Sequence, residues 1–239
     1  MSESERPKSI VITGSRQGIG RALCEHYLGR GYHVFGISRS PTDLTHRNYK
    51  HFEADVSDAT RIRPILQEID ALLSHGLEVV VNNAGISLSR MALLTDGVSA
   101  QKVLNTNVVG SFVVTREATA IMMRRGFGRI VSISSIEAVI SSPGAAIYAA
   151  SKVAVEKMTE AFSCEITNVD ITFNAIGISL FPGTGMTRGL GERARDAKVA
   201  KLSRPALLKV EEIAHVVDFL ASPLASAVTN QVLYFGGVR

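Results

Sequence analysis

Several features that would assign this chain of 239 residues to a particular class of protein are scarce or missing. Its two cysteines, Cys24 and Cys164, are too few for a disulfide framework or a tetrahedral metal site, and their apolar, helical surroundings predict buried thiols. No run of about 18 uncharged apolar residues is present, which argues against a membrane-spanning helix. Residues 1–7 are polar, so we expect a flexible tail without a secretory signal. Together these absences favour a cytoplasmic protein without a metal centre.

A concentration of one charge sign is also missing. The 26 Lys and Arg residues exceed the 22 Asp and Glu residues by four, and they are scattered along the chain. Because nucleic-acid binding needs a concentrated basic face, the charge pattern argues against a nucleic-acid partner. The hydrophobic share of 46% is that of a folded protein with a large core.

What the chain does contain is an alternation of short β-branched runs and amphipathic stretches. The runs predict about seven strands, at 9–13, 32–37, 51–54, 77–81, 129–133, 170–175 and 231–235. The stretches predict helices at 19–30, 61–73, 100–125, 149–166 and 211–220. Continuous apolar strands alternating with helices predict an α/β domain over residues 8–239. Its fold is expected to be doubly wound and Rossmann-type, with a parallel sheet covered by helices on both faces.

A glycine-rich turn joins the first predicted strand to the first helix. It covers residues 13–20 and has the spacing G-x-x-x-G-x-G. Glycines let the backbone turn tightly and approach a pyrophosphate, which then sits over free N–H groups at the helix N-terminus. A turn without a ligand would use glycine too, but the position between strand and helix favours a dinucleotide site. The candidate contacts are Gly14, Ser15, Arg16, Gly18, Ile19 and Gly20.

The end of the second strand predicts which dinucleotide binds. An acidic residue there would hydrogen-bond the ribose 2′-hydroxyl and repel a 2′-phosphate, but Ser38 and Arg39 occupy this position. Arg39 is suited to a bidentate contact with a phosphate, and a solvated loop arginine is the alternative. We therefore expect NADP(H) to be preferred over NAD(H).

Two further strand ends offer contacts to the same ligand. Asp55 and Val56 follow the third strand, where the carboxylate would either accept from the adenine amino group or cap the next helix. After the fourth strand, small side chains permit close approach of a ribose, although a turn without a ligand has the same composition. The residues concerned are Asn83, Ala84 and Gly85.

Four side chains are candidates for proton transfer. Tyr148 and Lys152 are four residues apart on a predicted helix and therefore share one face. A tyrosine phenolate costs about 4 kcal/mol to reach at pH 7, and a nearby ammonium would lower that cost. Ser135, at the end of the fifth strand, would hydrogen-bond the reacting oxygen. Asn107 lies in an otherwise apolar helix, where it would bend the helix, hold a water or be a satisfied core amide.

Jointly these motifs resemble the short-chain dehydrogenase/reductase family, in its small single-domain branch. The matching positions are 13–20, 55, 82–85, 107, 135, 148, 152 and 231–237. The resemblance implies that Tyr148 is the general acid/base and that Ser135 orients the carbonyl. It implies that Lys152 binds the nicotinamide ribose and lowers the pKa of the tyrosine, while Asn107 holds a water in a proton relay. It also implies a homotetramer or homodimer that pairs through the helices near 100–125 and 149–166.

The segment after the sixth strand departs from the family pattern. The family has Pro-Gly four residues after its strand-six Asn, here Asn174, whereas Pro182 and Gly183 come later in this chain. Thr184 is the expected contact to the nicotinamide carboxamide, and a substrate lid is expected over about 179–210. The lid is basic, which would suit an anionic substrate, although such a run is more often a solvated helix face. Its charged residues are Arg188, Glu192, Arg193, Arg195, Asp196, Lys198, Lys201, Arg204 and Lys209.

The resemblance implies a carbonyl reductase that transfers hydride from NADPH to a small-molecule ketone or a 3-oxoacyl group. A carrier-bound 3-oxoacyl substrate fits this class, but Val169 stands where such relatives tend to have an Arg; Arg124 and Arg125 offer a substitute. An NAD-dependent alcohol or sugar dehydrogenase is the enzymatic alternative. A non-catalytic sensor of NADP(H) is the alternative from another class, and it would have lost catalytic residues that this chain retains.

Overall fold

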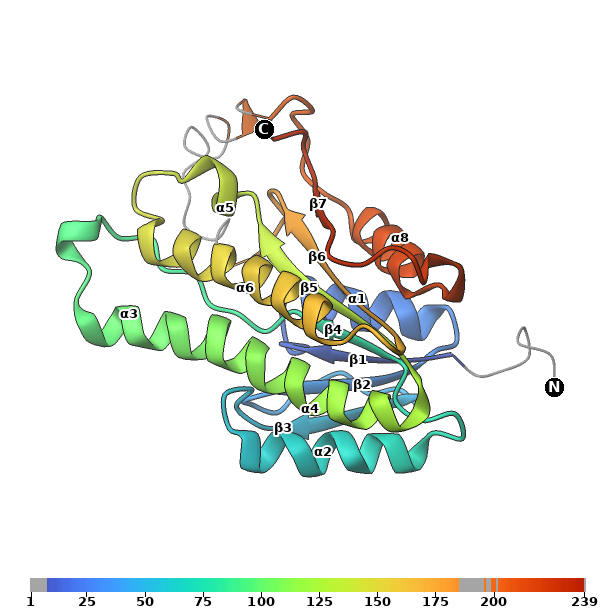
Figure 1. The fold of residues 1–239 in the computed structure, drawn as a ribbon. Helices are drawn as coiled ribbons and strands as arrows, with labels where there is room; N and C mark the ends of the chain where they lie inside the picture. Colours follow the sequence, from blue (N-terminus) through green and yellow to red (C-terminus); the bar gives the residue numbers. More distant parts are fainter. Residues whose placement is uncertain (1–7, 185–195, 197–198, 201, 239) are drawn as a thin grey trace.

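The chain folds around one sheet of parallel strands (Figure 1). The computed structural model describes residues 8–184, 196, 199–200 and 202–238. Within them the strand order is β3-β2-β1-β4-β5-β6-β7. The strands are β1 (Ser9–Thr13), β2 (His33–Ser38), β3 (Tyr49–Glu53), β4 (Val79–Asn82), β5 (Phe127–Ser135), β6 (Asp170–Ile178) and β7 (Val232–Tyr234). The expected doubly wound, Rossmann-type fold is confirmed.

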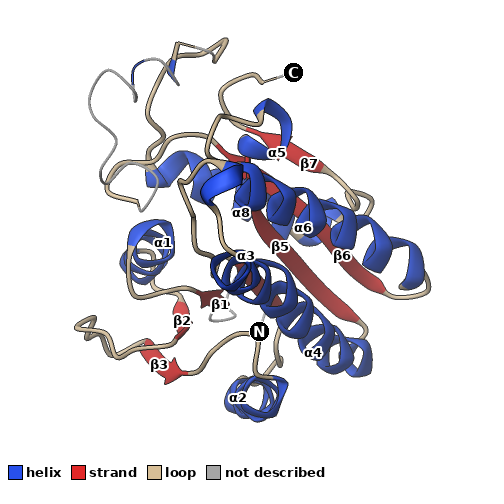
Figure 2. Cartoon of the chain, turned by 90° about the vertical axis from the view of Figure 1, so that its left-hand side faces the viewer, coloured by secondary structure: helices blue, strands red, loops and turns tan. Residues whose placement is uncertain are grey.

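Helices cover both faces of this sheet, as the view turned by 90° from Figure 1 shows (Figure 2). The α-helices are α1 (Gly18–Gly29), α2 (Ala59–Leu72), α3 (Gly97–Leu104), α4 (Gly110–Arg125), α5 (Glu137–Ile140), α6 (Ala146–Glu165) and α8 (Val210–Ala221). Short 3₁₀ turns occur at η2 (Ala92–Leu94) and η4 (Pro223–Ala225), and a π-helical turn, η3 (Asn105–Val109), joins α3 to α4. Helices α1 and α8 pack together on one face, and α2, α4 and α6 lie on the other.

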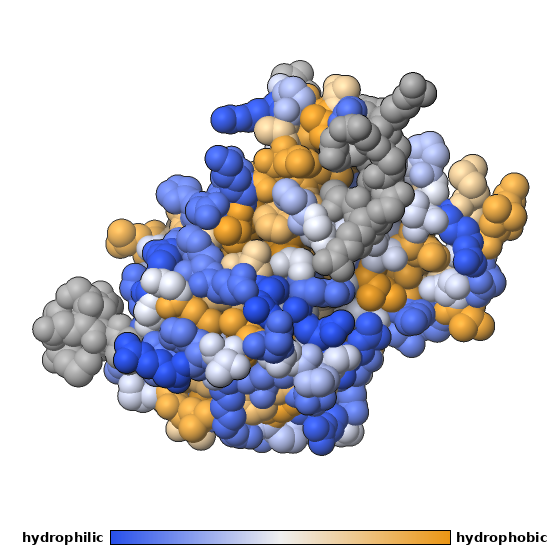
Figure 3. All heavy atoms as spheres, turned by 180° about the vertical axis from the view of Figure 1, so that it is seen from behind, coloured by the Kyte–Doolittle hydropathy of each residue, from blue (hydrophilic) through white to orange (hydrophobic). Residues whose placement is uncertain are grey.

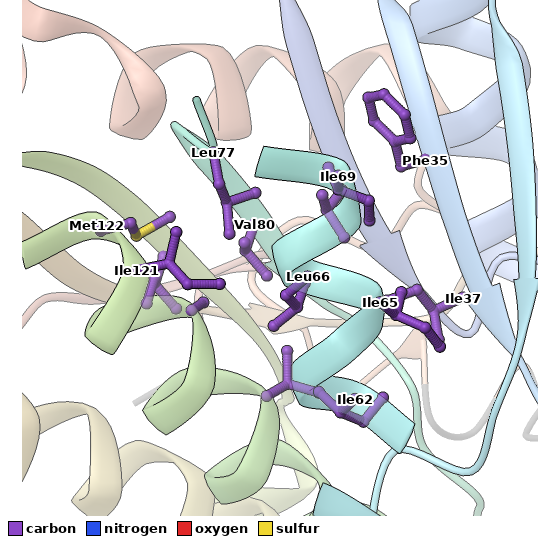
Figure 4. Close-up of a cluster of buried hydrophobic side chains, with 14 of the residues drawn as sticks. Phe35, Ile37, Ile62, Ile65, Leu66, Ile69, Leu77, Val80, Ile121 and Met122 are labelled. Carbon is purple, nitrogen blue, oxygen red and sulfur yellow. The ribbon is translucent and has the colours of Figure 1, made fainter. Parts of the chain in front are cut away.

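Two hydrophobic clusters hold these layers together. Successive side chains of a strand point to opposite faces, so Ile10 and Ile12 of β1 pack with α1 and α8, whereas Val11 packs with α2 and α4. Helix α2 buries Ile62, Ile65, Leu66 and Ile69 at helical spacing (Figure 4). Burial of one such side chain contributes about 1.5–3 kcal/mol. The clusters therefore explain why both faces of the sheet are covered.

The structure corrects three expectations about local structure. The regular helix expected over 100–125 is divided by the π-helical turn η3. Asp58, not Asp55, caps α2, because its side chain accepts from the backbone N–H of Thr60. Cys24 is buried, and burial raises the pKa of its thiol to about 12, but Cys164 near the end of α6 is exposed. The prediction of two buried thiols is therefore wrong for Cys164.

The surface opposite the view of Figure 1 mixes hydrophobic and hydrophilic side chains (Figure 3). Within the described ranges, every helix is too short or too polar to cross a lipid bilayer. Some expectations fall on residues outside the described part of the chain, namely the tail at 1–7 and the lid residues Arg188, Glu192, Arg193, Arg195, Lys198 and Lys201. The lid boundaries at 179–210 stay a prediction.

Candidate active site

A cavity of about 500 Å³ opens at the carboxyl ends of the central strands. Strand order reverses between β1 and β4, and ligands of doubly wound sheets bind at such a reversal. Segments that are distant in sequence meet there: the glycine turn, the ends of β2 and β4, and helix α6. Of the residues predicted to contact the coenzyme or to act in proton transfer, those lining the cavity are Gly14, Arg16, Gly18, Ile19, Ser38, Arg39, Val56, Asn83, Ala84, Gly85, Tyr148, Lys152 and Thr184.

The remaining predicted residues lie behind the cavity wall or beside it. Ser15 is fully buried, and its hydroxyl accepts from the Tyr49 hydroxyl at 3.4 Å. A Cβ on Gly20 would lie 2.3 Å from the carbonyl oxygen of Gly14, so this glycine permits the turn to fold onto α1. Asp55 lines a neighbouring, more open hollow together with Arg39. Asn107 and Ser135 are buried and are not among the residues that line the cavity.

The glycine turn is held close to the end of β4. Gly14 has a positive φ of 69°, and a Cβ on it would lie 2.9 Å from the Cα of Ala84. The Thr13 hydroxyl accepts from the backbone N–H groups of Asn83 (3.0 Å) and Ala84 (2.9 Å). Helix α1 then begins at Gly18 without a side-chain capping bond from Gln17 in the described chain. Its first N–H groups therefore face the cavity in the arrangement that suits a phosphate.

Two arginines mark the end of the cavity next to β2. Arg16 and Arg39 are both exposed, and neither forms a hydrogen bond or ion pair within the part of the chain that the structure describes. The nearby Arg21 differs, because it pairs with Glu25 and Asp43. Two unpaired guanidinium groups at one end of a cavity are suited to bind an anionic group such as a phosphate.

His51, a residue that sequence reasoning missed, holds the segment that carries Arg39 through contacts of its ring nitrogen. Nε2 of His51 lies 3.2 Å from the Ser38 hydroxyl and 3.1 Å from the carbonyl oxygen of Ser40, so it contacts both neighbours of Arg39. Its Nδ1 lies 2.9 Å from the hydroxyl of Tyr49. The available signal was the alternation in β3, which puts the polar residues 49 and 51 on one face.

Tyr148 lies at the inner end of the cavity and is 7% exposed. Burial raises the pKa of Tyr148 to about 12; a hydrogen bond with the Ser135 side chain lowers this pKa, and the negative charge of Glu137 raises it further. The Ser135 hydroxyl is itself held by the backbone N–H of Glu137 at 3.2 Å. Ser135 and Tyr148 thus form a fixed, buried pair of hydroxyl groups.

Lys152 lies one turn of α6 beyond Tyr148. Its Nζ is 5.7 Å from the centre of the Tyr148 ring and donates to the carbonyl oxygen of Ile133 at 2.7 Å. Burial lowers the pKa of Lys152 to about 8, and the charge of Glu156 opposes this shift. Burial thus disfavours the charged form of both groups in the protein alone, and the lowering of the tyrosine pKa by Lys152 beside a bound coenzyme stays a prediction.

Asn107 belongs to the π-helical turn η3. Its Oδ1 accepts from the backbone N–H of Ile86 at 2.8 Å, and its Nδ2 donates to the carbonyl oxygen of Ile86 and to the Ser151 hydroxyl, both at 2.9 Å. A Cβ on Gly85 would lie 3.3 Å from Oδ1 of Asn107 and 3.5 Å from Nζ of Lys152, so this glycine lies between them. The Asn107 amide is thus a satisfied core amide within an irregular helix, and its part in a proton relay stays a prediction.

Thr184 brings the start of the lid segment to the glycine turn. Its hydroxyl donates to the carbonyl oxygen of Phe181 at 3.1 Å, and its Cγ2 would lie 3.6 Å from a Cβ on Gly18. Gly183 and Thr184 both line the cavity. Of the basic lid residues, the described Arg204 and Lys209 are exposed and do not line it. The position of Thr184 is compatible with a contact to a bound ligand.

Comparison with known proteins places this geometry in a family. A sequence model described as short chain dehydrogenase matches residues 8–195. The 3-oxoacyl-(acyl-carrier-protein) reductase FabG of Rickettsia conorii is 32% identical over 96% of this chain and 95% of its own. The same enzyme of Salmonella typhimurium is 30% identical over 96% of both chains. The chain therefore belongs to the short chain dehydrogenase family, a family of oxidoreductases.

Solved structures agree with this assignment. A structure of ElxO with NADP bound has a TM-score of 0.86 and 28% sequence identity, and the match covers 95% of this chain and 96% of that chain. A tyrosine-to-phenylalanine variant of ElxO with NADPH bound gives the same TM-score at 27% identity. The fold with its flanking helices is thus shared with ElxO, whose structures hold NADP or NADPH.

Proposed function

We propose that this protein is an NADPH-dependent carbonyl reductase that acts on a ketone or a 3-oxoacyl group. One observation carries the proposal: Tyr148 and Lys152 line the same cavity as the glycine turn and Arg39. A single ligand of dinucleotide size would therefore reach from the unpaired arginines to the buried tyrosine. The FabG relatives, named as 3-oxoacyl-(acyl-carrier-protein) reductases, support the choice of substrate class.

The residues present fit a nicotinamide dinucleotide. The close approach of Gly14 to Ala84 and the uncapped start of α1 are features that a pyrophosphate site needs. Arg39 would bind the 2′-phosphate with help from Arg16, and Asp55 would receive the adenine in the hollow beside the cavity. When bound, the coenzyme supplies the hydride. The ElxO structures with NADP and NADPH support the choice of coenzyme.

In the proposed reaction, Tyr148 donates its proton to the carbonyl oxygen of the substrate as that oxygen gains negative charge. A pKa near 12 keeps the phenol protonated at neutral pH, which is the form that a reductase requires. Ser135 hydrogen-bonds the tyrosine and would hold the carbonyl oxygen beside it. The Lys152 ammonium would then stabilise the phenolate and supply the proton that restores it.

Two alternatives to this function fit the site less well. An NAD-dependent alcohol or sugar dehydrogenase would favour an acidic residue at the end of β2, where this chain has Ser38 and Arg39. A non-catalytic NADP(H) sensor would have no use for the buried pair of Tyr148 and Ser135. A comparison of NADPH with NADH as hydride donor distinguishes the proposed reductase from an NAD-dependent dehydrogenase. Turnover of any carbonyl substrate distinguishes it from a non-catalytic sensor.

The proposal also concerns partners. Apolar side chains close to half exposed lie along η3, α4 and α6, namely Val109, Phe112, Met123 and Val153, and would pair copies of the chain as a homotetramer or homodimer. If the substrate is carrier-bound, Arg124 at the end of α4 is exposed for docking, whereas Arg125 pairs with Asp70 at 3.0 Å. We further propose that the enzyme acts in the cytoplasm.

A substrate screen tests the proposed function. Purified protein is mixed with NADPH and with small ketones, 3-oxoacyl thioesters or 3-oxoacyl groups on an acyl carrier protein, and loss of the reduced-coenzyme absorbance is followed. We expect turnover with a member of the 3-oxoacyl set and a weaker response when NADH replaces NADPH. Absence of turnover with every carbonyl, combined with tight NADPH binding, would favour the sensor instead.

A further inference from the structure

Helix α6 carries a third polar side chain on the face of Tyr148 and Lys152. Glu156 follows Lys152 by four residues, as Lys152 follows Tyr148, so the three side chains form one stripe along the helix. Two side chains of this stripe form hydrogen bonds with two consecutive residues near the end of β5. Lys152 donates to the carbonyl oxygen of Ile133, and the next residue, Ser134, donates its hydroxyl to Oε1 of Glu156. Glu156 is thus part of the same contact surface as the proposed catalytic residues.

The other carboxylate oxygen of Glu156 reaches a different strand. Oε2 accepts from the hydroxyl of Tyr234 in β7 at 2.6 Å. The Tyr234 ring crosses the intervening strand β6 at Gly177, where a Cβ would lie 2.0 Å from its Cδ1. Only a glycine leaves room for this ring without displacing it. One carboxylate therefore connects α6 to both β5 and β7.

The charge of Glu156 matters because Lys152 is buried. Lys152 is 5% exposed, and burial is the main cause that lowers its pKa, while the carboxylate of Glu156 raises it. Further titratable side chains come from neighbouring elements: Glu137 of α5 acts on Tyr148, and Tyr234 of β7 is bound to Glu156 itself. The packed amide of Asn107 is neutral. Glu156 is therefore the carboxylate whose charge acts on Lys152 from its own helix.

We propose that Glu156 is a positioning residue, which fixes the face of α6 that carries Tyr148 and Lys152 and supplies a negative charge on that face. The role in turnover rests on the proposed reductase function, whereas the effect on Lys152 does not. The carboxylate does not line the cavity and touches no reacting atom. Its influence passes through Lys152 and through the hydrogen bonds to Ser134 and Tyr234.

The pH profile of kcat/KM with NADPH tests this role. Glu156→Gln keeps the size of the side chain but removes the charge, so the pH above which activity declines should fall by about 0.5–1.5 pH units. The KM for NADPH should change less than about twofold, since no coenzyme contact is altered. Glu160→Gln is the matched control on the same helix, where the carboxylate is exposed and pairs with Lys157. This control should leave the profile unchanged.

A second readout is independent of turnover. The side-chain NMR signal of Lys152, identified by its loss in Lys152→Met, is titrated in the wild type and in Glu156→Gln. We expect the titration midpoint to move to lower pH in the variant. Equal midpoints in both proteins would overturn the inference. An inactive wild type would instead contradict the proposed function, and the NMR titration would still decide the role of Glu156.

Glu156→Asp covers the case in which the glutamine variant does not fold. It keeps the charge but shortens the reach to Ser134 and Tyr234. The midpoint should therefore stay within about 0.3 pH units of the wild type, while kcat falls about two- to fivefold. A midpoint shift without a change in kcat would contradict the assignment of both charge and position to Glu156.

Discussion

The two ends of the cavity are built in opposite ways. At the inner end, Tyr148 and Lys152 are nearly inaccessible, and their partners come from β5 and from the same helix. At the outer end, Arg16 and Arg39 are exposed, and their side chains form no hydrogen bond or ion pair within the described residues. The inner end is therefore preorganised by burial at a cost in electrostatic free energy, whereas the outer end has little effect on folding. Changes at the two ends should separate activity, coenzyme choice and stability.

The largest effect is expected at the inner end. Lys152→Met removes the ammonium that would stabilise the phenolate of Tyr148, so kcat/KM should fall on the order of 10²–10⁴-fold. Steady-state kinetics with NADPH and the best carbonyl substrate measure this loss. Lys157→Met, a change of an exposed lysine on the same helix, is the control and should keep near-wild-type activity. Similar activities of the two variants would contradict the role of Lys152.

The next effect concerns coenzyme choice at the outer end. Arg39→Ala should weaken NADPH binding about 10- to 100-fold, because a charge-assisted contact to a phosphate is lost. NADH binding should change less than about threefold, since NADH lacks that phosphate. Fluorescence titration of both coenzymes gives the ratio. Arg47→Ala, which changes an arginine away from the cavity lining, serves as the control. Equal losses for both coenzymes would contradict the 2′-phosphate contact.

The smallest effect concerns the free energy of unfolding. Lys152→Met should lower activity but raise stability. Burial lowers the pKa of Lys152 from 10.5 to about 8, so between these values the unfolded chain holds a proton that the folded chain has lost. Stability then rises with pH in that window, and below it the buried ammonium is a cost. Lys152→Met should raise the free energy of unfolding at pH 7 by about 1–3 kcal/mol.

Denaturant unfolding at pH 7 and pH 10 measures that gain. The difference between variant and wild type should shrink at the higher pH, where the wild-type lysine is neutral in the folded protein. Arg39→Ala should stay within about 0.5 kcal/mol of the wild type at both pH values. A Lys152→Met protein less stable than the wild type at pH 7 would mean that the hydrogen bond to Ile133 outweighs the burial cost.

The glycine turn at the outer end and the elements of the fold could be predicted from the sequence, because each is encoded by residues that are close together in the chain. The glycine turn is encoded within residues 13–20, and strands and helices follow from periodic apolar residues. The four-residue spacing of Tyr148 and Lys152 also predicts their shared face on α6. Such features depend on neighbours in the chain, which is why the observed strands, helices and cavity lining agree with the motifs.

The inner end was less accessible because its contacts join distant residues. The π-helical turn at Asn107 accompanies bonds to Ile86 and Ser151, and no local pattern predicts those partners. Glu156 accepts a hydrogen bond from Tyr234 of β7, which lies 78 residues away in the sequence. The exposure of Cys164 likewise depends on which part of α6 its neighbours cover. Burial also raises the pKa of Tyr148 in the protein alone, and the spacing of residues gives no measure of this desolvation.

The central claim is that Tyr148 transfers a proton at the inner end without being needed to hold the coenzyme. Tyr148→Phe, assayed for both carbonyl reduction and NADPH binding, tests it most directly. We predict that reduction is lost by at least about 10³-fold while the dissociation constant of NADPH stays within about threefold. Turnover close to that of the wild type, with coenzyme binding intact, would contradict the account.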